Sequence, residues 1–230
     1  MPRLLLVGHG RMGRLVEDLA SAYGFEIAAI LDGASNSGGA GITREACRDV
    51  AVAVDFSLAD TVPATMRALA AYGVSVVEGT TGWSAHEAEM RVVVERAGIG
   101  AVVAANFSLG ANLLEALSGE LARRMQARPA YGAWVHEMHH VKKRDAPSGT
   151  ALAIVSAMRR AGYDPPIDVS STRAGSIPGT HTVGFDGPAE TLTLAHTVRD
   201  RATFAHGALE AARWVVGRRG WFTMRDVLGF

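Results

Sequence analysis

The sequence predicts an α/β fold for the first half of the chain and a sheet-rich α+β arrangement for the second half. In the first half, short aliphatic runs alternate with amphipathic helical patterns, which is typical of a parallel sheet covered by helices. Beyond about residue 108, three strand-like runs occur, and turn residues between the last two are typical of hairpins. A chain of 230 residues can form one domain or two, and the change near residue 108 favours two.

A glycine-rich turn follows the first predicted strand. The aliphatic run from Arg3 to Val7 leads directly into Gly8, Gly10 and Gly13, and a helical pattern then extends to Gly24. The first glycine allows a tight turn, the second lets a pyrophosphate approach the backbone, and the third lets the helix lie close to the strand. This spacing between a strand and a helix predicts a dinucleotide site.

An acidic residue completes this unit. Asp32 ends the next apolar run, Ile27 to Leu31, about twenty residues after the glycines. A carboxylate in this position accepts hydrogen bonds from the adenosine ribose and repels a 2′-phosphate. The following residues, 33–37, include no arginine or lysine to offset that repulsion. The unit therefore predicts a Rossmann-like domain that binds NADH (favoured) or NADPH.

The other elements are predicted from apolar periodicity and turn residues. In the first half we expect strands at 52–56, 74–77 and 101–105, a helix at 63–72, and a second helix that Ser84 and Glu87 open as a capping box and that ends near residue 97. In the second half we expect helices at 112–125, 151–161 and 203–216, and strands at 167–172, 180–185 and 191–198. Because the carboxyl ends of parallel strands line one crevice, we expect Phe56-Ser57, Gly79-Thr80-Thr81 and Ala105-Asn106-Phe107 to face the cofactor.

The stretch from Glu137 to Ala151 carries the most chemistry. It contains His139, His140 and Lys143, followed by the turn Pro147-Ser148-Gly149-Thr150. Adjacent histidines on a strand point to opposite faces, so one of the two is expected to be structural. Ser148 is placed to cap a helix, whose first N–H groups and positive dipole end suit a carboxylate or phosphate. The stretch predicts a pocket for a small anion with an acid beside it.

Composition and charge argue against several classes of partner. The 23 Lys and Arg residues balance the 23 Asp and Glu residues, so no net charge draws the chain to nucleic acid or to an anionic membrane. The aliphatic run from Leu4 to Val7 is too short for a signal sequence or a membrane span. The single Cys47 excludes an internal disulfide and fits a reducing compartment. We therefore expect a cytoplasmic protein without nucleic-acid or membrane partners.

Motifs along nearly the whole chain resemble those of the dihydrodipicolinate reductase family. In chain order they are Gly10-Arg11-Met12-Gly13, Asp55-Phe56-Ser57, Gly79-Thr80-Thr81-Gly82, Ala104-Ala105-Asn106-Phe107-Ser108, Glu137 with His139-His140, Lys143, Asp145-Ala146-Pro147-Ser148-Gly149-Thr150-Ala151, Arg173 with Gly175, His181-Thr182-Val183 and Phe204-Ala205. The block from the histidines to Thr150 is the most specific of these motifs. The glycine turn alone would not identify a family.

The resemblance implies a domain organisation and a reaction. It implies a dinucleotide-binding domain of residues 1–107 with 207–230, and a substrate-binding domain of residues 108–206 whose open mixed sheet builds a homotetramer. It further implies hydride transfer from NAD(P)H to a cyclic unsaturated imine dicarboxylate derived from 4-hydroxy-tetrahydrodipicolinate. The product is tetrahydrodipicolinate, in the diaminopimelate route to lysine.

The resemblance also implies roles for individual residues. His139 is the proton donor and Lys143 a second donor, whereas His140, Ser148, Gly149 and Thr150 bind the substrate. The implied cofactor-binding residues are Gly8, His9, Gly10, Arg11, Met12, Asp32, Phe56, Gly79, Thr80, Thr81, Ala104, Ala105, Asn106 and Phe107. No metal is implied.

Two other functions fit parts of the sequence. His136-Glu137-Met138-His139-His140 matches H-E-x-x-H, the pattern of zinc-dependent hydrolases, which requires a helix. The flanking Ala133-Trp134-Val135 and Val141 indicate a strand, on which residues four apart lie about 13 Å from each other, too far for one zinc ion. The third possibility is a non-catalytic sensor that binds a nicotinamide nucleotide, against which His139 and Lys143 argue.

Overall fold

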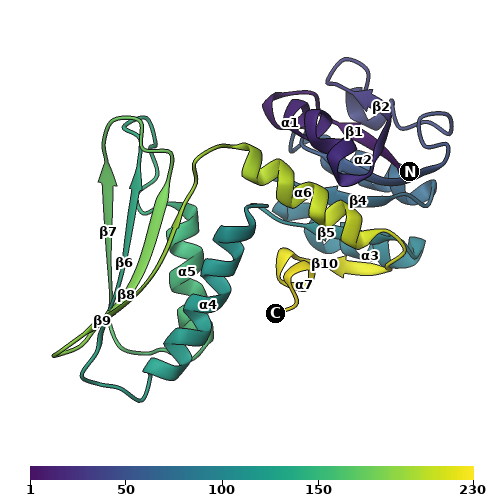
Figure 1. Cartoon of the computed structure of the whole chain (residues 1–230). Helices are drawn as coiled ribbons and strands as arrows, with labels where there is room; N and C mark the ends of the chain where they lie inside the picture. Colours follow the sequence, from purple (N-terminus) through teal and green to yellow (C-terminus); the bar gives the residue numbers. More distant parts are fainter. The chain divides into compact units, whose positions relative to one another are not determined.

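The computed structural model describes residues 1–230. The chain divides into two compact units, one formed by residues 1–109 with 201–230 and the other by residues 110–200 (Figure 1). The first unit is therefore built from both ends of the chain.

The first unit contains a six-stranded sheet in which every neighbouring pair is parallel. The strand order is β10-β5-β4-β3-β1-β2. The strands are β1 (Arg3–Val7), β2 (Glu26–Leu31), β3 (Val50–Asp55), β4 (Ser75–Glu78), β5 (Gly100–Val103) and β10 (Gly220–Phe222). Because β1 lies between β2 and β3, the connections on its two sides run in opposite directions across the sheet. In such sheets, ligands bind in the crevice at the carboxyl ends of the strands where the direction changes.

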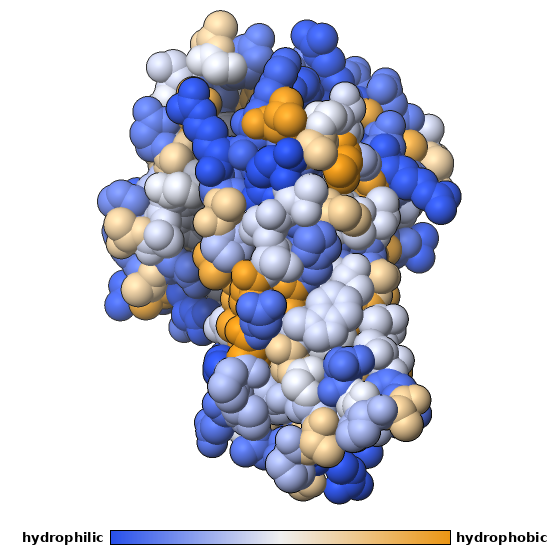
Figure 2. Space-filling model, turned by 90° about the vertical axis from the view of Figure 1, so that its left-hand side faces the viewer, coloured by the Kyte–Doolittle hydropathy of each residue, from blue (hydrophilic) through white to orange (hydrophobic).

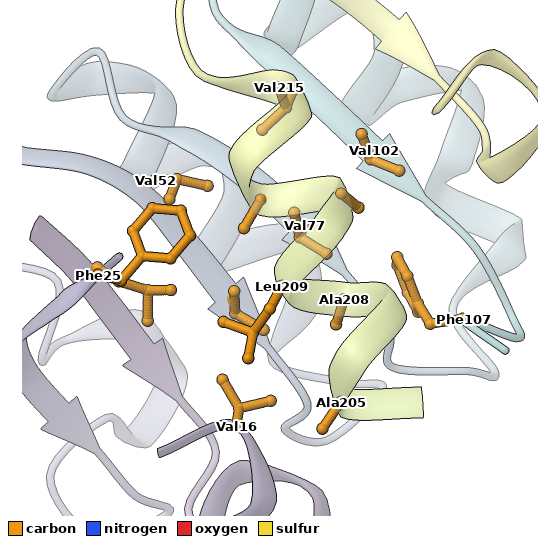
Figure 3. Packing of buried hydrophobic residues seen from close by; sticks show 14 of the residues in the cluster. Val16, Phe25, Val52, Val77, Val102, Phe107, Ala205, Ala208, Leu209 and Val215 are labelled. Carbon is orange, nitrogen blue, oxygen red and sulfur yellow. The ribbon is translucent and has the colours of Figure 1, made fainter. Parts of the chain in front are cut away.

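Helices cover both faces of this sheet. On one face, α1 (Arg11–Ala20) and α6 (Ala202–Val215) pack against the strands, and in Figure 3 α6 crosses the sheet between Phe25 and Phe107. On the other face, α2 (Val62–Ala71) and α3 (Glu87–Ala97) enclose a second hydrophobic cluster. The short elements are η1 (Ser21–Tyr23), η2 (Ser37–Gly39), η3 (Ser84–His86) and α7 (Met224–Leu228). The predicted Rossmann-like parallel sheet is thus confirmed.

The second unit is a four-stranded mixed sheet with two helices. Its strand order is β7-β6-β8-β9, with β6 parallel to β7 and antiparallel to β8. The elements are α4 (Leu109–Met125), β6 (Gly132–His139), α5 (Gly149–Arg160), β7 (Ile167–Arg173), β8 (Thr180–Asp186) and β9 (Thr191–Thr197). Both helices contribute to one core cluster with β6 and β8, which lies on a single face of the sheet (Figure 1).

Two details differ from the sequence-based expectations. The predicted capping box of Ser84 and Glu87 is wrong, because residues 84–86 form a short 3-10 turn and α3 begins only at Glu87, without a side-chain cap. The strand β10 was not expected from the C-terminal residues, which pair with β5 at the edge of the sheet. A three-residue strand carries no readable alternation, so only its tertiary pairing reveals it.

The surface is largely polar. Figure 2 shows a face on which hydrophilic residues dominate and hydrophobic residues form small groups. None of the helices has the length and apolar character that crossing a bilayer requires.

Candidate functional site

The glycine turn of the first unit has the geometry that the motif predicts. Gly8 has a positive φ of 89°, and a Cβ there would lie 2.3 Å from the carbonyl oxygen of Phe56. A Cβ on Gly13 would lie 1.9 Å from the carbonyl oxygen of Gly8. Nothing lies within 4 Å of a Cβ built on Gly10, the N-cap of α1. The first and third glycines are therefore required by the fold, whereas the second leaves open space before a helix N-terminus, where an anion is stabilised.

A cleft of about 430 Å³ lies beside this turn, within the first unit. It is lined by Gly10, Arg11, Met12, Phe56, Ser57, Leu58, Ala59, Gly79, Thr80, Thr81 and Arg201. The helix N-terminus and two guanidinium groups bring positive charge to one cleft, which suits the phosphates of a dinucleotide. Seven of these residues are among the predicted cofactor ligands, whereas Arg201 is not.

The other predicted cofactor residues lie outside the lining of this cleft. Gly8 is buried in the turn, and His9 Nε2 lies 2.7 Å from Glu17 Oε2. The segment 104–107 directly follows β5. Its last side chain, Phe107, is 2% exposed and packs edge-to-face on Phe56, which itself lines the cleft. Phe107 therefore supports the wall of the cleft from the core.

Asp32 follows β2 and its side chain is exposed. Its Oδ1 accepts hydrogen bonds from the Ala34 and Ser35 amides at 3.0 and 2.8 Å, and from the Ser35 hydroxyl at 2.8 Å. These bonds, with the Ser35 amide as the largest contributor, lower the pKa of Asp32. The turn thus fixes an ionised carboxylate, and no protein hydrogen bond is formed by its Oδ2.

In the second unit, Glu137 organises a buried polar cluster. It lies on β6 with no exposed surface, and Arg173 of β7 donates to both of its oxygens, at 2.6 Å to Oε1 and 2.9 Å to Oε2. The Ser148 amide also donates to Oε1, at 3.2 Å. Burial opposes ionisation, but the hydrogen bonds from Arg173 and other donors hold the pKa of Glu137 at about 2. The carboxylate is therefore a fixed anion at neutral pH.

His139 is bonded to this anion. Its Nδ1 pairs with Glu137 Oε2, and because a carboxylate only accepts, Nδ1 carries a hydrogen and Nε2 is the atom that can give or take a proton. A Cβ built on Gly179 would lie 3.1 Å from Nε2, so the missing side chain leaves this nitrogen accessible. Burial, together with the charges of Lys143 and Arg173, lowers the pKa of His139 below its usual range although Glu137 opposes this effect. The geometry is that of an oriented general acid.

Ser148 caps α5 as predicted, with its Oγ accepting from the Ala151 amide at 3.2 Å. The hydroxyl also lies 2.8 Å from Nε2 of His181, and Ser148 is only 2% exposed. Burial and the nearby His139 lower the pKa of His181 to about 4, so the Ser148 hydroxyl is hydrogen-bonded to a neutral imidazole. These two bonds fix the position of the hydroxyl at the start of α5. The predicted contact of Ser148 with the substrate stays a prediction.

The remaining predicted substrate residues lie around the start of α5. Lys143 Nζ forms an ion pair with Asp145 Oδ2 at 2.8 Å. Gly149 is exposed and Thr150 half-buried in the first turn of the helix. His140 follows directly after β6 and its Nδ1 is buried without a hydrogen-bond partner. An anion at this helix end meets backbone N–H groups of the first turn and an ammonium group that can exchange partners.

The geometry argues against the zinc pattern. His136 lies on the strand β6, not on a helix, and its Nδ1 is 2.7 Å from the Ser170 hydroxyl. A different group, Glu137, His139 and His181, has ligand atoms within 4.8 Å of one another. Both carboxylate oxygens of that group are already bonded to Arg173. Each of the three side chains therefore already has a hydrogen-bond partner in the protein.

Sequence reasoning missed four contributors to these sites. Arg201, Arg173, His181 and Gly179 lie 33 to 191 residues along the chain from the groups that they meet, and local periodicity does not reveal such contacts. Two of them, Arg173 and His181, belong to the motifs that resemble the family, and this membership is the one sequence feature that points to a role for them. Glu137 was also quoted as a motif residue but received no role.

Both units of the chain match known protein families. Residues 2–107 match the family described as "Dihydrodipicolinate reductase, N-terminus", and residues 110–228 match "Dihydrodipicolinate reductase, C-terminus". The 4-hydroxy-tetrahydrodipicolinate reductase of Christiangramia forsetii is 31% identical over 238 residues, covering 98% of this chain and 97% of the relative. The enzyme of the same name from Thiobacillus denitrificans is 38% identical over 258 residues, covering 96% and 95%.

Solved structures show the same fold. A dipicolinate-bound dihydrodipicolinate reductase from a Paenisporosarcina species superimposes with a TM-score of 0.80 at 21% identity, over 97% of each chain. A probable dehydrogenase from Thermotoga maritima gives a TM-score of 0.60 at 11% identity, over 98% of this chain and 92% of the other. With both of its units matched along their length, the chain belongs to the dihydrodipicolinate reductase family.

Proposed function

We propose that this chain is an NAD(P)H-dependent 4-hydroxy-tetrahydrodipicolinate reductase of the diaminopimelate route to lysine. Its substrate is the cyclic unsaturated imine dicarboxylate derived from 4-hydroxy-tetrahydrodipicolinate. The observation that carries this proposal beyond family membership is the pairing of His139 Nδ1 with the buried carboxylate of Glu137, because it leaves Nε2 free for proton transfer. A bound nicotinamide supplies the hydride.

His139 supplies the proton in this proposal. Addition of a hydride to the conjugated ring moves negative charge toward the ring nitrogen, and an imidazolium held nearby neutralises that charge. Glu137 fixes the ring orientation and favours the charged imidazole. Burial keeps the pKa of His139 below its usual range in the free chain, and a dianionic substrate counteracts this effect by favouring the protonated ring.

Substrate carboxylates are held at the start of α5. We assign them to the N–H groups of Gly149 and Thr150, with His140 and Lys143 as side-chain donors. In the free chain, the ammonium group of Lys143 pairs with Asp145. A bound substrate carboxylate takes the place of Asp145 in this ion pair. These groups orient the ring against the cofactor, and such positioning lowers the barrier without forming a bond.

The cofactor is held by the cleft of the first unit. Gly10, which has no neighbouring atoms where a side chain would lie, allows the backbone to approach the diphosphate, and Arg11 and Arg201 bring positive charge. Leu58 and Phe56 offer apolar surface in the same cleft. The remaining assigned cofactor residues, among them His9, Ala104, Ala105 and Asn106, stay a prediction.

A coupled assay tests the reaction. Pyruvate and aspartate semialdehyde are condensed freshly, and oxidation of NADH or NADPH is followed by absorbance. We expect oxidation only when the condensation product is present. Cofactor binding without turnover in this assay would favour the non-catalytic sensor instead.

Asp32 is proposed to select NADH. Asp32→Asn keeps an oxygen to accept from the Ala34 and Ser35 amides but removes the negative charge. We expect the ratio of kcat/KM for NADPH to that for NADH to rise roughly tenfold, the size of a removed repulsion of about 1 to 2 kcal/mol near the protein surface. Asp168→Asn, a change of equal charge on β7, is the control. An unchanged ratio would show that this carboxylate does not select the cofactor.

We further propose that the sheet of the second unit joins four copies of the chain in the cytoplasm. The helices α4 and α5 pack on one face of this sheet, and Trp134 lies on the other face, flat over Gly184, where a Cβ would be 2.1 Å from its ring. The helices leave this face of the sheet uncovered, so a second copy can pack on it. Light scattering after gel filtration should give four times the mass of one chain, and Trp134→Glu should give smaller species.

A further inference from the structure

Two acidic side chains lie next to each other beneath the cofactor cleft. Asp55 ends β3 and Glu78 ends β4, and the two residues are paired across the parallel strands. Side chains at paired positions lie about 5 Å apart on the same face of a sheet. Neither residue has any exposed surface.

The strands on either side offer no countercharge at this level of the sheet. The partner of Asp55 on β1 is Val7, and the partner of Glu78 on β5 is Val103. Asp55 Oδ2 and Glu78 Oε2 are both buried without a hydrogen-bond partner. Two charged carboxylates in apolar surroundings repel each other strongly, whereas one proton between them removes one charge and supplies a donor.

The ionisation of both groups agrees with this arrangement. Burial raises the pKa of Asp55 to about 6. Burial and the charge of Asp55 raise the pKa of Glu78 well above its usual range. At neutral pH the pair therefore retains a proton.

The other oxygen of each carboxyl holds a loop of the cleft. Asp55 Oδ1 accepts from the Ser57 amide at 2.8 Å, and Glu78 Oε1 accepts from the Thr80 amide at 2.7 Å. The Ser57 amide also lies 3.0 Å from the Thr80 hydroxyl, which joins the two loops. Ser57 and Thr80 both line the cleft. A ring of contacts thus runs from one carboxyl through both loops to the other carboxyl.

We propose that Asp55 and Glu78 share one proton and act as positioning residues, which lock the loops after β3 and β4 together in the shape that binds the nicotinamide cofactor. This inference rests on the proposed function, because it assumes that the cleft holds NAD(P)H. Neither side chain reaches the cofactor itself, since both are fully buried.

Two substitutions of Glu78 separate positioning from stability. Glu78→Gln keeps an oxygen for the Thr80 amide and has an N–H₂ group that replaces the shared proton. Glu78→Leu removes both functions while keeping a side chain of similar size. We expect the Kd for NADH, measured by quenching of protein fluorescence, to stay within about twofold for Gln and to rise about tenfold for Leu, which is the effect of one lost hydrogen bond.

The controls exclude a merely structural effect. Ser75→Ala changes a buried residue of β4 away from the cleft and should leave the Kd unchanged. In Glu78→Leu, kcat at saturating NADH should remain within about threefold of the unsubstituted chain while KM for NADH rises in parallel with Kd. If Glu78→Leu does not fold, Glu78→Ala replaces it with the same expectation.

Each other outcome overturns the inference. A folded Leu or Ala variant with the original Kd would show that the pair does not position the loops. A Gln variant as weak as Leu would show that a shared proton is not what matters. Failure of the proposed function is distinct from both results, because it appears in the unsubstituted chain itself, as absence of NADH binding or as absence of turnover in the coupled assay.

Discussion

His139→Gln is expected to lower kcat by about 10²- to 10⁴-fold, the range for loss of a general acid. Glutamine keeps a donor near Glu137 but has no proton to transfer at neutral pH. Because the cofactor cleft is formed by the first unit and His139 belongs to the second, the Kd for NADH should change by less than about twofold. Steady-state kinetics and NADH titration together give this comparison.

The control for this variant is His136→Gln, on the opposite face of the same strand. It should retain activity to within about twofold.

The pH profile of the unsubstituted chain gives a further test. The pKa of His139 in the free enzyme lies below its usual range. We expect kcat/KM to fall as pH rises through this pKa, because the protonated imidazole is then lost. This limb should be missing from His139→Gln. Equal losses in turnover and in cofactor affinity would mean that His139 is a structural residue.

Glu137→Ala is expected to lower the thermal midpoint of the second unit by roughly 10 °C. Truncation leaves Arg173 without its anionic partner and frees Nδ1 of His139, and breaking a buried ion pair on one side typically costs about 3 to 5 kcal/mol. Calorimetry or circular dichroism at neutral pH measures the shift. Activity should fall as well, since the orientation of the imidazole is lost.

Glu120→Ala is the matched control for this second variant. Glu120 pairs with two arginines of α4 on the surface, so its removal should leave the midpoint almost unchanged.

The pH dependence of the loss of stability in Glu137→Ala gives a second check. The pKa of Glu137 is lowered to about 2, so its contribution is complete above the pKa of an unfolded glutamate and is lost as pH falls toward 2. The difference between the original chain and Glu137→Ala should therefore shrink in acid, and a constant difference would contradict this origin.

Most of the fold follows from local patterns. The glycine turn, the alternation of strands and helices and the serine cap of α5 are all encoded within a few neighbouring residues, and the structure has them where the sequence predicts them. The capping box failed because Ser84 starts a separate 3-10 turn, which the same residue types also favour. The strand β10 could not be foreseen, since three residues carry too little pattern.

The polar partners of the site were harder to predict than its reactive groups. His139 and Lys143 stand out by residue type, whereas Arg173 acts on Glu137 only because β6 and β7 are neighbours in a sheet. The Asp55 and Glu78 pair likewise results from strand register, and neither acid differs from a surface acid when the sequence is read alone. The pairing register of strands far apart in sequence therefore brings these polar groups together, and local sequence patterns do not report that register.

The helix α6 has a consequence for biosynthesis. It is formed by residues 202–215. Its Ala205, Ala208 and Leu209 pack against a sheet in which five of the six strands, β1 to β5, end by residue 103 (Figure 3). During translation, the part of that face that α6 covers stays exposed until nearly the whole polypeptide has emerged from the ribosome. The second unit, continuous in sequence, has all of its strands and helices available earlier. Nascent chains therefore expose apolar surface between the synthesis of β5 and that of α6, and such exposure favours aggregation.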